Sequence, residues 1–132
     1  ADATNAWLLY TRLRSGLDWH PEGESNVYSA LVEGVPNSEG VAMAYQLLCD
    51  KVGISCQVVQ GTWKDEVHCW NLITLDGISW HLDVTAEESQ SAFLHTDEEM
   101  AKKYSWSRED YPACTGDTAS VVTDVEDGVD NG

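Results

Sequence analysis

The sequence predicts an α+β domain in which a central helix packs on an antiparallel sheet. Residues 38–52 place apolar side chains over most of a helical surface, which is typical of a helix enclosed by the rest of its domain. Three strand-like segments follow, and Asp76 and Gly77 join the last two, which is the strongest short signal for a hairpin. Because a hairpin requires antiparallel pairing, the order of these segments defines the fold class.

The first part of the chain is predicted to hold one helix and one loop. Aromatic and aliphatic residues recur at helical spacing in residues 4–14, before a break at Gly16. Residues 15–26 contain two glycines and one proline, which favours a loop. Residues 27–32 form a short apolar stretch that leads into the central helix.

The other elements are expected after Gly53, which gives the central helix its C-terminal stop. A short helix is predicted at residues 96–104, because Thr96 is a favourable N-cap and three acidic residues follow it in the first turn. The three strands are predicted at residues 54–63, 66–75 and 78–85.

Length and charge limit the kinds of partner that we expect. The 132 residues fit a single domain, predicted at residues 1–115, and residues 116–132 are expected to form an acidic, flexible tail or linker. The net charge is −16, so nucleic acids and anionic membrane surfaces would be repelled. No stretch approaches the roughly 20 apolar residues that a membrane span needs, so we expect no membrane insertion.

The cysteines give no indication of a metal site or other cofactor. None of them forms a C-x-x-C pair, which structural zinc sites commonly use. Their disulfide state is left open. The four are Cys49, Cys56, Cys69 and Cys114.

Hairpin geometry places a histidine close to a carboxylate. With a two-residue turn, Leu75 pairs with Ile78, and His68 then lies diagonal to Asp83, within reach of a side-chain hydrogen bond. The same alternation puts Trp70 on the face of His68. A carboxylate beside an imidazole fixes its tautomer, as a general base requires. A strand histidine is more often simply solvated, or satisfied by a neighbour, so geometry alone leaves a structural role open. His81, on the same face, is interpreted as structural or as part of a rim.

Three separated motifs resemble the bacterial transglutaminase-like domain. Residues 38–42, Ser-Glu-Gly-Val-Ala, resemble the family's Cys-Glu-Gly-Tyr-Ala at the start of its central helix. Residues 68–71, His-Cys-Trp-Asn, resemble its His-x-Trp-Asn, and residues 80–85 resemble its motif of a tryptophan followed by Asp-x-Thr. The resemblance extends over residues 28–114. It implies a papain/transglutaminase-like fold and enzymes of amide acyl transfer or peptide hydrolysis.

This resemblance assigns the family's catalytic cysteine to Ser38, its histidine to His68 and its aspartate to Asp83, and we expect Trp70 to wall the cleft. Family members use a thiolate activated by the histidine and by the helix N-terminus. A thiol has an ordinary pKa of about 8.5, and a hydroxyl is far less acidic. Serine is also a favoured helix N-cap, as is Asn37, so Ser38 has a purely structural interpretation too.

Three functions therefore stay open. The domain is inactive or quieted and binds a peptide or protein, or it is an active hydrolase with a Ser38-His68-Asp83 triad, or it is a deliberate cysteine-to-serine form of an active cysteine enzyme. The sequence favours the first and third over the second. Residues 93–99 and 111–114 resemble secreted members, so a secreted or cell-surface location is expected.

Overall fold

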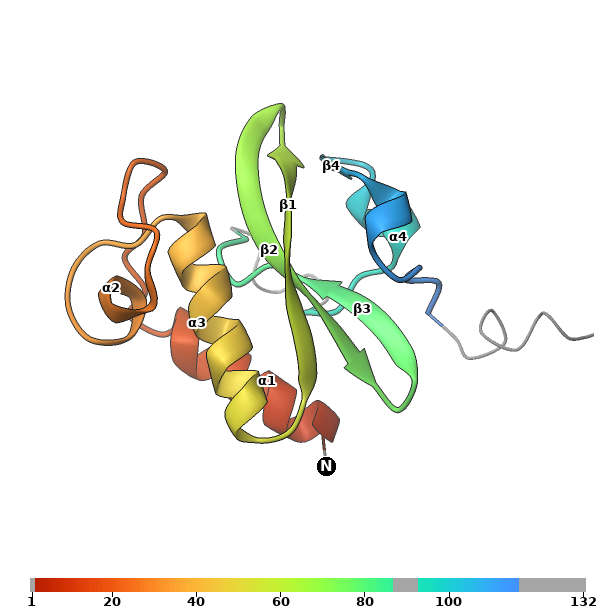
Figure 1. Ribbon diagram of the computed structural model, residues 1–132, viewed down its shortest axis with the longest axis horizontal. Coiled ribbons are helices and arrows are strands. Elements are labelled where there is room, and N and C mark those ends of the chain that lie inside the picture. The colour runs from red at the N-terminus through yellow and green to blue at the C-terminus, as the bar shows by residue number, and fades with distance from the viewer. Residues whose placement is uncertain (1, 87–92, 117–132) are drawn as a thin grey trace, which may run out of the picture.

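The structure is a computed structural model that describes residues 2–86 and 93–116. Three helices lie on one side of the central strands, and α4 and β4 lie on the other side (Figure 1). The four strands form one antiparallel sheet in the order β3-β2-β1-β4, which confirms the predicted α+β class. No helix in these two described ranges is long and apolar enough to cross a membrane. The elements are α1 (Asp2–Arg14), α2 (Val27–Leu31), α3 (Ser38–Lys51), β1 (Ser55–Trp63), β2 (Glu66–Leu75), β3 (Ile78–Leu82), α4 (Asp97–Met100), β4 (Tyr104–Trp106) and a 3-10 turn (Arg108–Asp110).

The predicted central helix is α3, and it begins and ends by recognisable backbone signals. Asn37 caps its first turn by accepting a hydrogen bond from Gly40 N at 2.9 Å. At its other end Gly53 adopts a φ of +79°, and Ile54 N donates to Cys49 O at 2.9 Å. These bonds satisfy backbone groups that a helix end otherwise leaves without partners.

The predicted hairpin register is confirmed. Leu75 pairs with Ile78, and the ladder continues to Asn71 opposite Leu82. Strand β3 ends at Leu82, three residues earlier than predicted. The cause is a local turn, because the carboxylate of Asp83 accepts from both the backbone N and the hydroxyl of Thr85.

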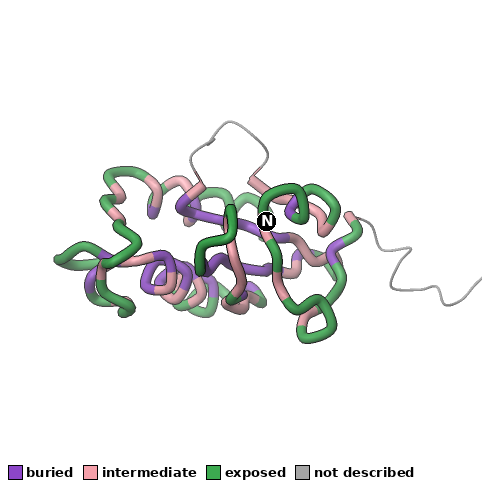
Figure 2. Tube along the Cα trace, turned by 90° about the horizontal axis from the view of Figure 1, so that it is seen from above, coloured by how far each residue is buried: buried purple, intermediate pink, exposed green. Residues whose placement is uncertain are grey.

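Both faces of the sheet are buried, and buried segments run through the centre of the molecule (Figure 2). The core under α1 and α3 contains, among others, Tyr10, Tyr45, Cys49, Ile73, Leu75 and Leu82. A second cluster on the opposite face contains Val59, Trp70, Leu72, Met100 and Cys114. The segment after residue 93 therefore covers the face on which the sequence placed most polar groups of the hairpin.

The predicted helix at residues 96–104 is shorter in the structure, and a strand follows it. Thr96 and Glu99 form a capping box at its start, as the acidic first turn suggested, but α4 ends at Met100. The chain then forms β4, which pairs with the end of β1. This close approach depends on Gly61, since a Cβ there would collide with the backbone carbonyl of Ser105.

Candidate active site

Ser38 is the first residue of α3, and its side chain does not cap the helix. Asn37 holds that role, so the purely structural interpretation of Ser38 as N-cap is wrong. Instead, Ser38 Oγ points to β2 and accepts a hydrogen bond from Cys69 N at 3.0 Å, with 9% of the residue exposed. The side chain of residue 38 thus lies between a helix N-terminus and a backbone N–H, two groups that both favour negative charge.

His68 and Asp83 form the hydrogen bond that the hairpin geometry predicted. The distance from His68 Nε2 to Asp83 Oδ2 is 3.0 Å, and both residues are buried, at 5% and 6% exposure. Because Nε2 faces a carboxylate, it carries the ring proton of the neutral imidazole. Nδ1 is then the ring nitrogen that can accept a proton from a reacting group. His68 directly precedes Cys69, whose N–H contacts Ser38, so β2 brings the imidazole and residue 38 to the same end of α3.

Asp83 is held ionised by its neighbours. Burial acts to raise its pKa, but donors from His68, Tyr104 and Thr85 outweigh burial, and the pKa of Asp83 is lowered from its ordinary value. Tyr104 Oη donates to Oδ2 at 2.6 Å, and Thr85 Oγ1 donates to Oδ1 at 2.7 Å. The Thr85 oxygen also lies 3.1 Å from His68 Nε2. The carboxylate is therefore fixed in position and available to orient the imidazole.

Aromatic rings surround the imidazole. The ring centroids of Trp19 and Trp63 each lie 5.8 Å from that of His68, and both residues are half-buried. Trp70 was expected as a wall of the cleft, but it is 1% exposed and packs in the second cluster, with its ring 6.4 Å from His68. Trp70 thus supports the imidazole from inside the protein. The surface beside His68 comes from Trp19 and Trp63, which the sequence analysis missed.

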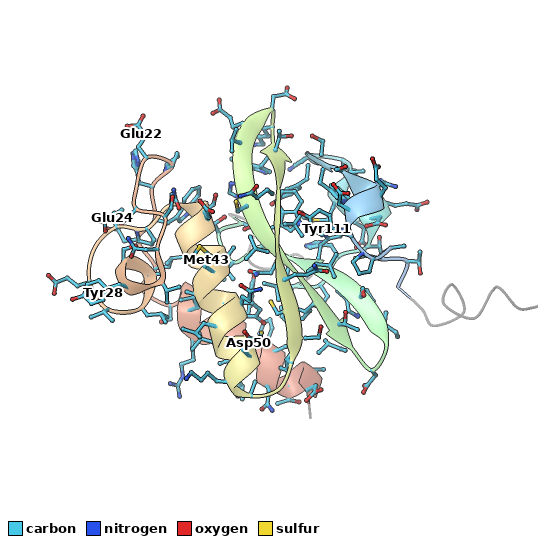
Figure 3. All side chains as sticks on the ribbon, viewed as in Figure 1. Glu22, Glu24, Tyr28, Met43, Asp50 and Tyr111 are labelled. Atoms are coloured by element: carbon cyan, nitrogen blue, oxygen red, sulfur yellow. The ribbon has the colours of Figure 1, made fainter. Side chains whose placement is uncertain are left out.

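The loop that carries Trp19 is fixed to the start of α3 by a glycine. A Cβ at Gly40 would collide with the backbone carbonyls of Glu24 and Asn26, so only glycine permits this contact. Glu22 and Glu24 project from the same loop (Figure 3). Ser38 and Gly40 of the central-helix motif thus have different roles. Ser38 faces β2, and Gly40 leaves room for the backbone of the loop.

A second polar cluster lies beyond Trp70. His81, Asp97 and Cys114 place one possible ligand atom each within 4.8 Å of one another, which raises the question of a metal ion. Trp70 Nε1 donates to His81 Nδ1 at 3.0 Å, so the proton of a neutral His81 is on Nε2, which lies 2.8 Å from Asp97 Oδ1. A metal on Nε2 would displace that proton while Nδ1 still faces a donor. The arrangement fits a hydrogen-bond network better than a metal site.

The cysteine nearest to the site is not placed as a nucleophile. Cys69 follows His68 on β2, so its side chain points to the opposite face of the strand. Burial raises the pKa of the Cys69 thiol to about 11, with smaller contributions from Glu39 and Asp83. A thiol of this kind is protonated at neutral pH and reacts slowly.

The profile of the family described as the Transglutaminase-like superfamily (Transglut_core) matches residues 2–83, which is more than half of the chain. The chain therefore belongs to the transglutaminase-like superfamily. A solved structure described as "Crystal structure of a TGase" aligns with a TM-score of 0.56 and 10% identity, and at this identity the likeness concerns the fold alone. The alignment covers 81% of this chain and 30% of that chain. A comparison with curated proteins found no match.

Proposed function

We propose that this domain carries a transglutaminase-like acyl-transfer site that is quieted by serine at the nucleophile position, and that it still binds a peptide or protein. The observation that supports this most strongly is the buried His68–Asp83 pair, which is complete although residue 38 is not cysteine. A carboxylate with three donor side chains costs desolvation energy, which a purely structural position would avoid more simply with apolar residues.

The surroundings of residue 38 suit a thiolate better than a hydroxyl. The N-terminus of α3 and the N–H of Cys69 both act on the position of Ser38 Oγ. They stabilise an anion that exists before substrate arrives, as a cysteine thiolate does. A serine hydroxyl keeps its proton until the moment of attack, so it gains little from this environment in the ground state. Acyl transfer by the chain with serine at position 38 should therefore be weak or absent.

A peptide or protein is the partner that fits the site. The half-buried rings of Trp19 and Trp63 beside His68 offer apolar contact area to an extended chain. The net charge of −16 favours neutral or basic partners over acidic ones. We also propose a secreted or cell-surface location, which is supported by the resemblance of residues 93–99 and 111–114 to secreted members of the family.

A second candidate is a serine hydrolase with Ser38, His68 and Asp83 as its triad. The complete His68–Asp83 pair favours it, because the same pair would serve a serine nucleophile. The hydrogen bonds of the described residues favour the quieted site, since they join Ser38 Oγ to Cys69 N and not to the His68 ring, to which the hydroxyl donates in a working triad. If cysteine is the natural residue at position 38, the same geometry describes an active cysteine enzyme.

Two chemical probes, read by intact mass, distinguish these functions. A fluorophosphonate should leave the parent protein unlabelled, and iodoacetamide should add one label to Ser38→Cys beyond those of the parent at neutral pH. Fluorophosphonate labelling of the parent that disappears in Ser38→Ala would establish the hydrolase instead. If the thiol of Ser38→Cys reacts no faster than that of a free cysteine, the domain is a binding module without a preserved site.

A further inference from the structure

The segment that follows the family match supplies part of the site. The matched region ends at residue 83, yet Asp83 receives its shortest hydrogen bond from Tyr104, at 2.6 Å. Tyr104 begins β4, a strand that lies entirely outside the matched residues. Among the described residues that donate to Asp83, Tyr104 is the one that lies far from the motifs that resemble the family.

We propose that Tyr104 is a positioning residue for the site, which holds Asp83 ionised and fixes the carboxylate oxygen that receives His68. The role of Tyr104 in a reaction rests on the proposed function, whereas the effect of Tyr104 on Asp83 can be tested independently of that function. Oδ2 accepts from both His68 Nε2 and Tyr104 Oη, whereas Oδ1 is engaged by Thr85. Rotation of the carboxylate would break bonds on both oxygens.

The fold fixes the ring of Tyr104 in place. Tyr104 lies opposite Trp63 in the pairing of β4 with β1, and Gly61 in the same ladder allows the two backbones to come close. The ring packs edge-on against Trp70, with centroids 4.9 Å apart. Trp70 is in turn held by its bond to His81. The Tyr104 hydroxyl is therefore held at Asp83 by strand pairing and by contact of its half-buried ring with the buried ring of Trp70.

The other charged and titratable groups near Asp83 do not replace Tyr104. Arg14 on α1 donates to the backbone carbonyls of Val84 and Ala86, so its guanidinium group bonds the backbone that follows Asp83 and not the Asp83 carboxylate. Tyr10 on α1 has its pKa raised, mainly by burial and in smaller part by Asp83. The pKa of the Cys69 thiol is raised mainly by burial and in smaller part by the charges of Glu39 and Asp83. Loss of the Tyr104 hydroxyl would leave His68 and Thr85 as the side-chain donors among the described residues.

The test is the pH dependence of stability in Tyr104→Phe. Asp83 has a lowered pKa in the folded protein, so its contribution is complete above the unfolded value of about 3.9 and is lost as pH falls through the folded value. The urea midpoint of Tyr104→Phe should lie below that of the parent at neutral pH, and the difference between the two midpoints should shrink as pH falls below about 4 through the lowered pKa of Asp83. A loss of packing alone would give a gap that does not depend on pH.

Tyr111→Phe provides the matched control. Tyr111 packs beside the same cluster (Figure 3), and in the described part of the chain its hydroxyl accepts from Gln60 N at 3.4 Å and bonds to no carboxylate. Its curve should stay parallel to that of the parent. Parallel curves for Tyr104→Phe as well would overturn the proposal. As a second measurement, the ¹³C signal of the Asp83 carboxyl should titrate at higher pH in Tyr104→Phe, and an unchanged titration would also overturn it.

Alkylation of Ser38→Cys separates this inference from the proposed function. A reactive thiol together with parallel stability curves would remove the role of Tyr104 and leave the function standing. An unreactive thiol together with converging curves would remove the function and leave the link between Tyr104 and Asp83 in place.

Discussion

Acidification should destabilise the protein through His81, and the hydrogen-bond geometry gives the reason. His81 is fully buried, accepts from Trp70 Nε1 through Nδ1 and faces Asp97 through Nε2. Protonation of Nδ1 would set two donors against each other. Burial is the main cause of the lowered pKa of His81. Asp97 acts to raise this pKa, whereas His95 and Arg108 add to the lowering.

The sign and size of the effect follow from proton linkage. The unfolded chain protonates His81 near its ordinary value of 6.5, whereas the folded protein does so only at lower pH. The stability that the neutral imidazole contributes is therefore complete above about pH 6.5 and decreases as pH falls below it. For one proton the free energy of unfolding falls by at most about 1.4 kcal/mol per pH unit in this window.

Urea unfolding at several pH values from about 7.5 to 5 measures this slope. His81→Gln keeps an amide donor for Asp97 and carries no charge at any pH, so its stability curve should be flatter than that of the parent. His20→Gln is the control, because His20 is exposed and its ring accepts a hydrogen bond from the backbone N of Glu22. If the parent and His81→Gln have the same slope in this range, His81 titrates alike in both states and the argument from Trp70 is wrong.

Two further predictions concern the backbone around the site. Gly61→Ala should lower the free energy of unfolding by about 3 kcal/mol, since its Cβ would collide with the backbone of β4. Gly53→Ala, at a positive φ in open space, should cost only about 1 kcal/mol, so similar melting temperatures of the two variants would refute the close approach of β4. Asn37→Ala should cost about 1 kcal/mol in urea unfolding through the lost bond to Gly40 N, and an unchanged midpoint would show that the cap contributes nothing.

The parts of the fold that the sequence predicts well are those with local signals. The central helix follows from its apolar periodicity and from Gly53, and the hairpin register follows from Asp76 and Gly77. The approach of His68 to Asp83 was predictable from the hairpin, but the ladder ends at Leu82, so the final geometry of the bond depends on the turn that begins at Asp83. The choice between Ser38 and Asn37 as N-cap was not predictable, since both residue types suit that position.

The parts that the sequence missed depend on contacts between distant segments. Strand β4 has only three residues, too few to show a periodicity, and its pairing depends on the missing side chain of Gly61. Trp70 alternates onto the polar face of the hairpin, but α4 and the segment after it cover that face, so Trp70 is buried. The bond from Tyr104 to Asp83 spans 21 positions and follows no motif. The surface beside His68 combines Trp19 from a loop and Trp63 from the end of β1, and no motif joins these two residues.

The central claim is that position 38 keeps an environment built for a thiolate paired with an imidazolium. The most direct measurement is the rate of iodoacetamide alkylation against pH for Ser38→Cys and for Ser38→Cys combined with His68→Ala, with the parent protein as the control for the four native cysteines. We predict fast alkylation near neutral pH in the single variant and a midpoint well below the ordinary thiol pKa of about 8.5, both lost when His68 is replaced. A midpoint near 8.5 in both variants would contradict the claim.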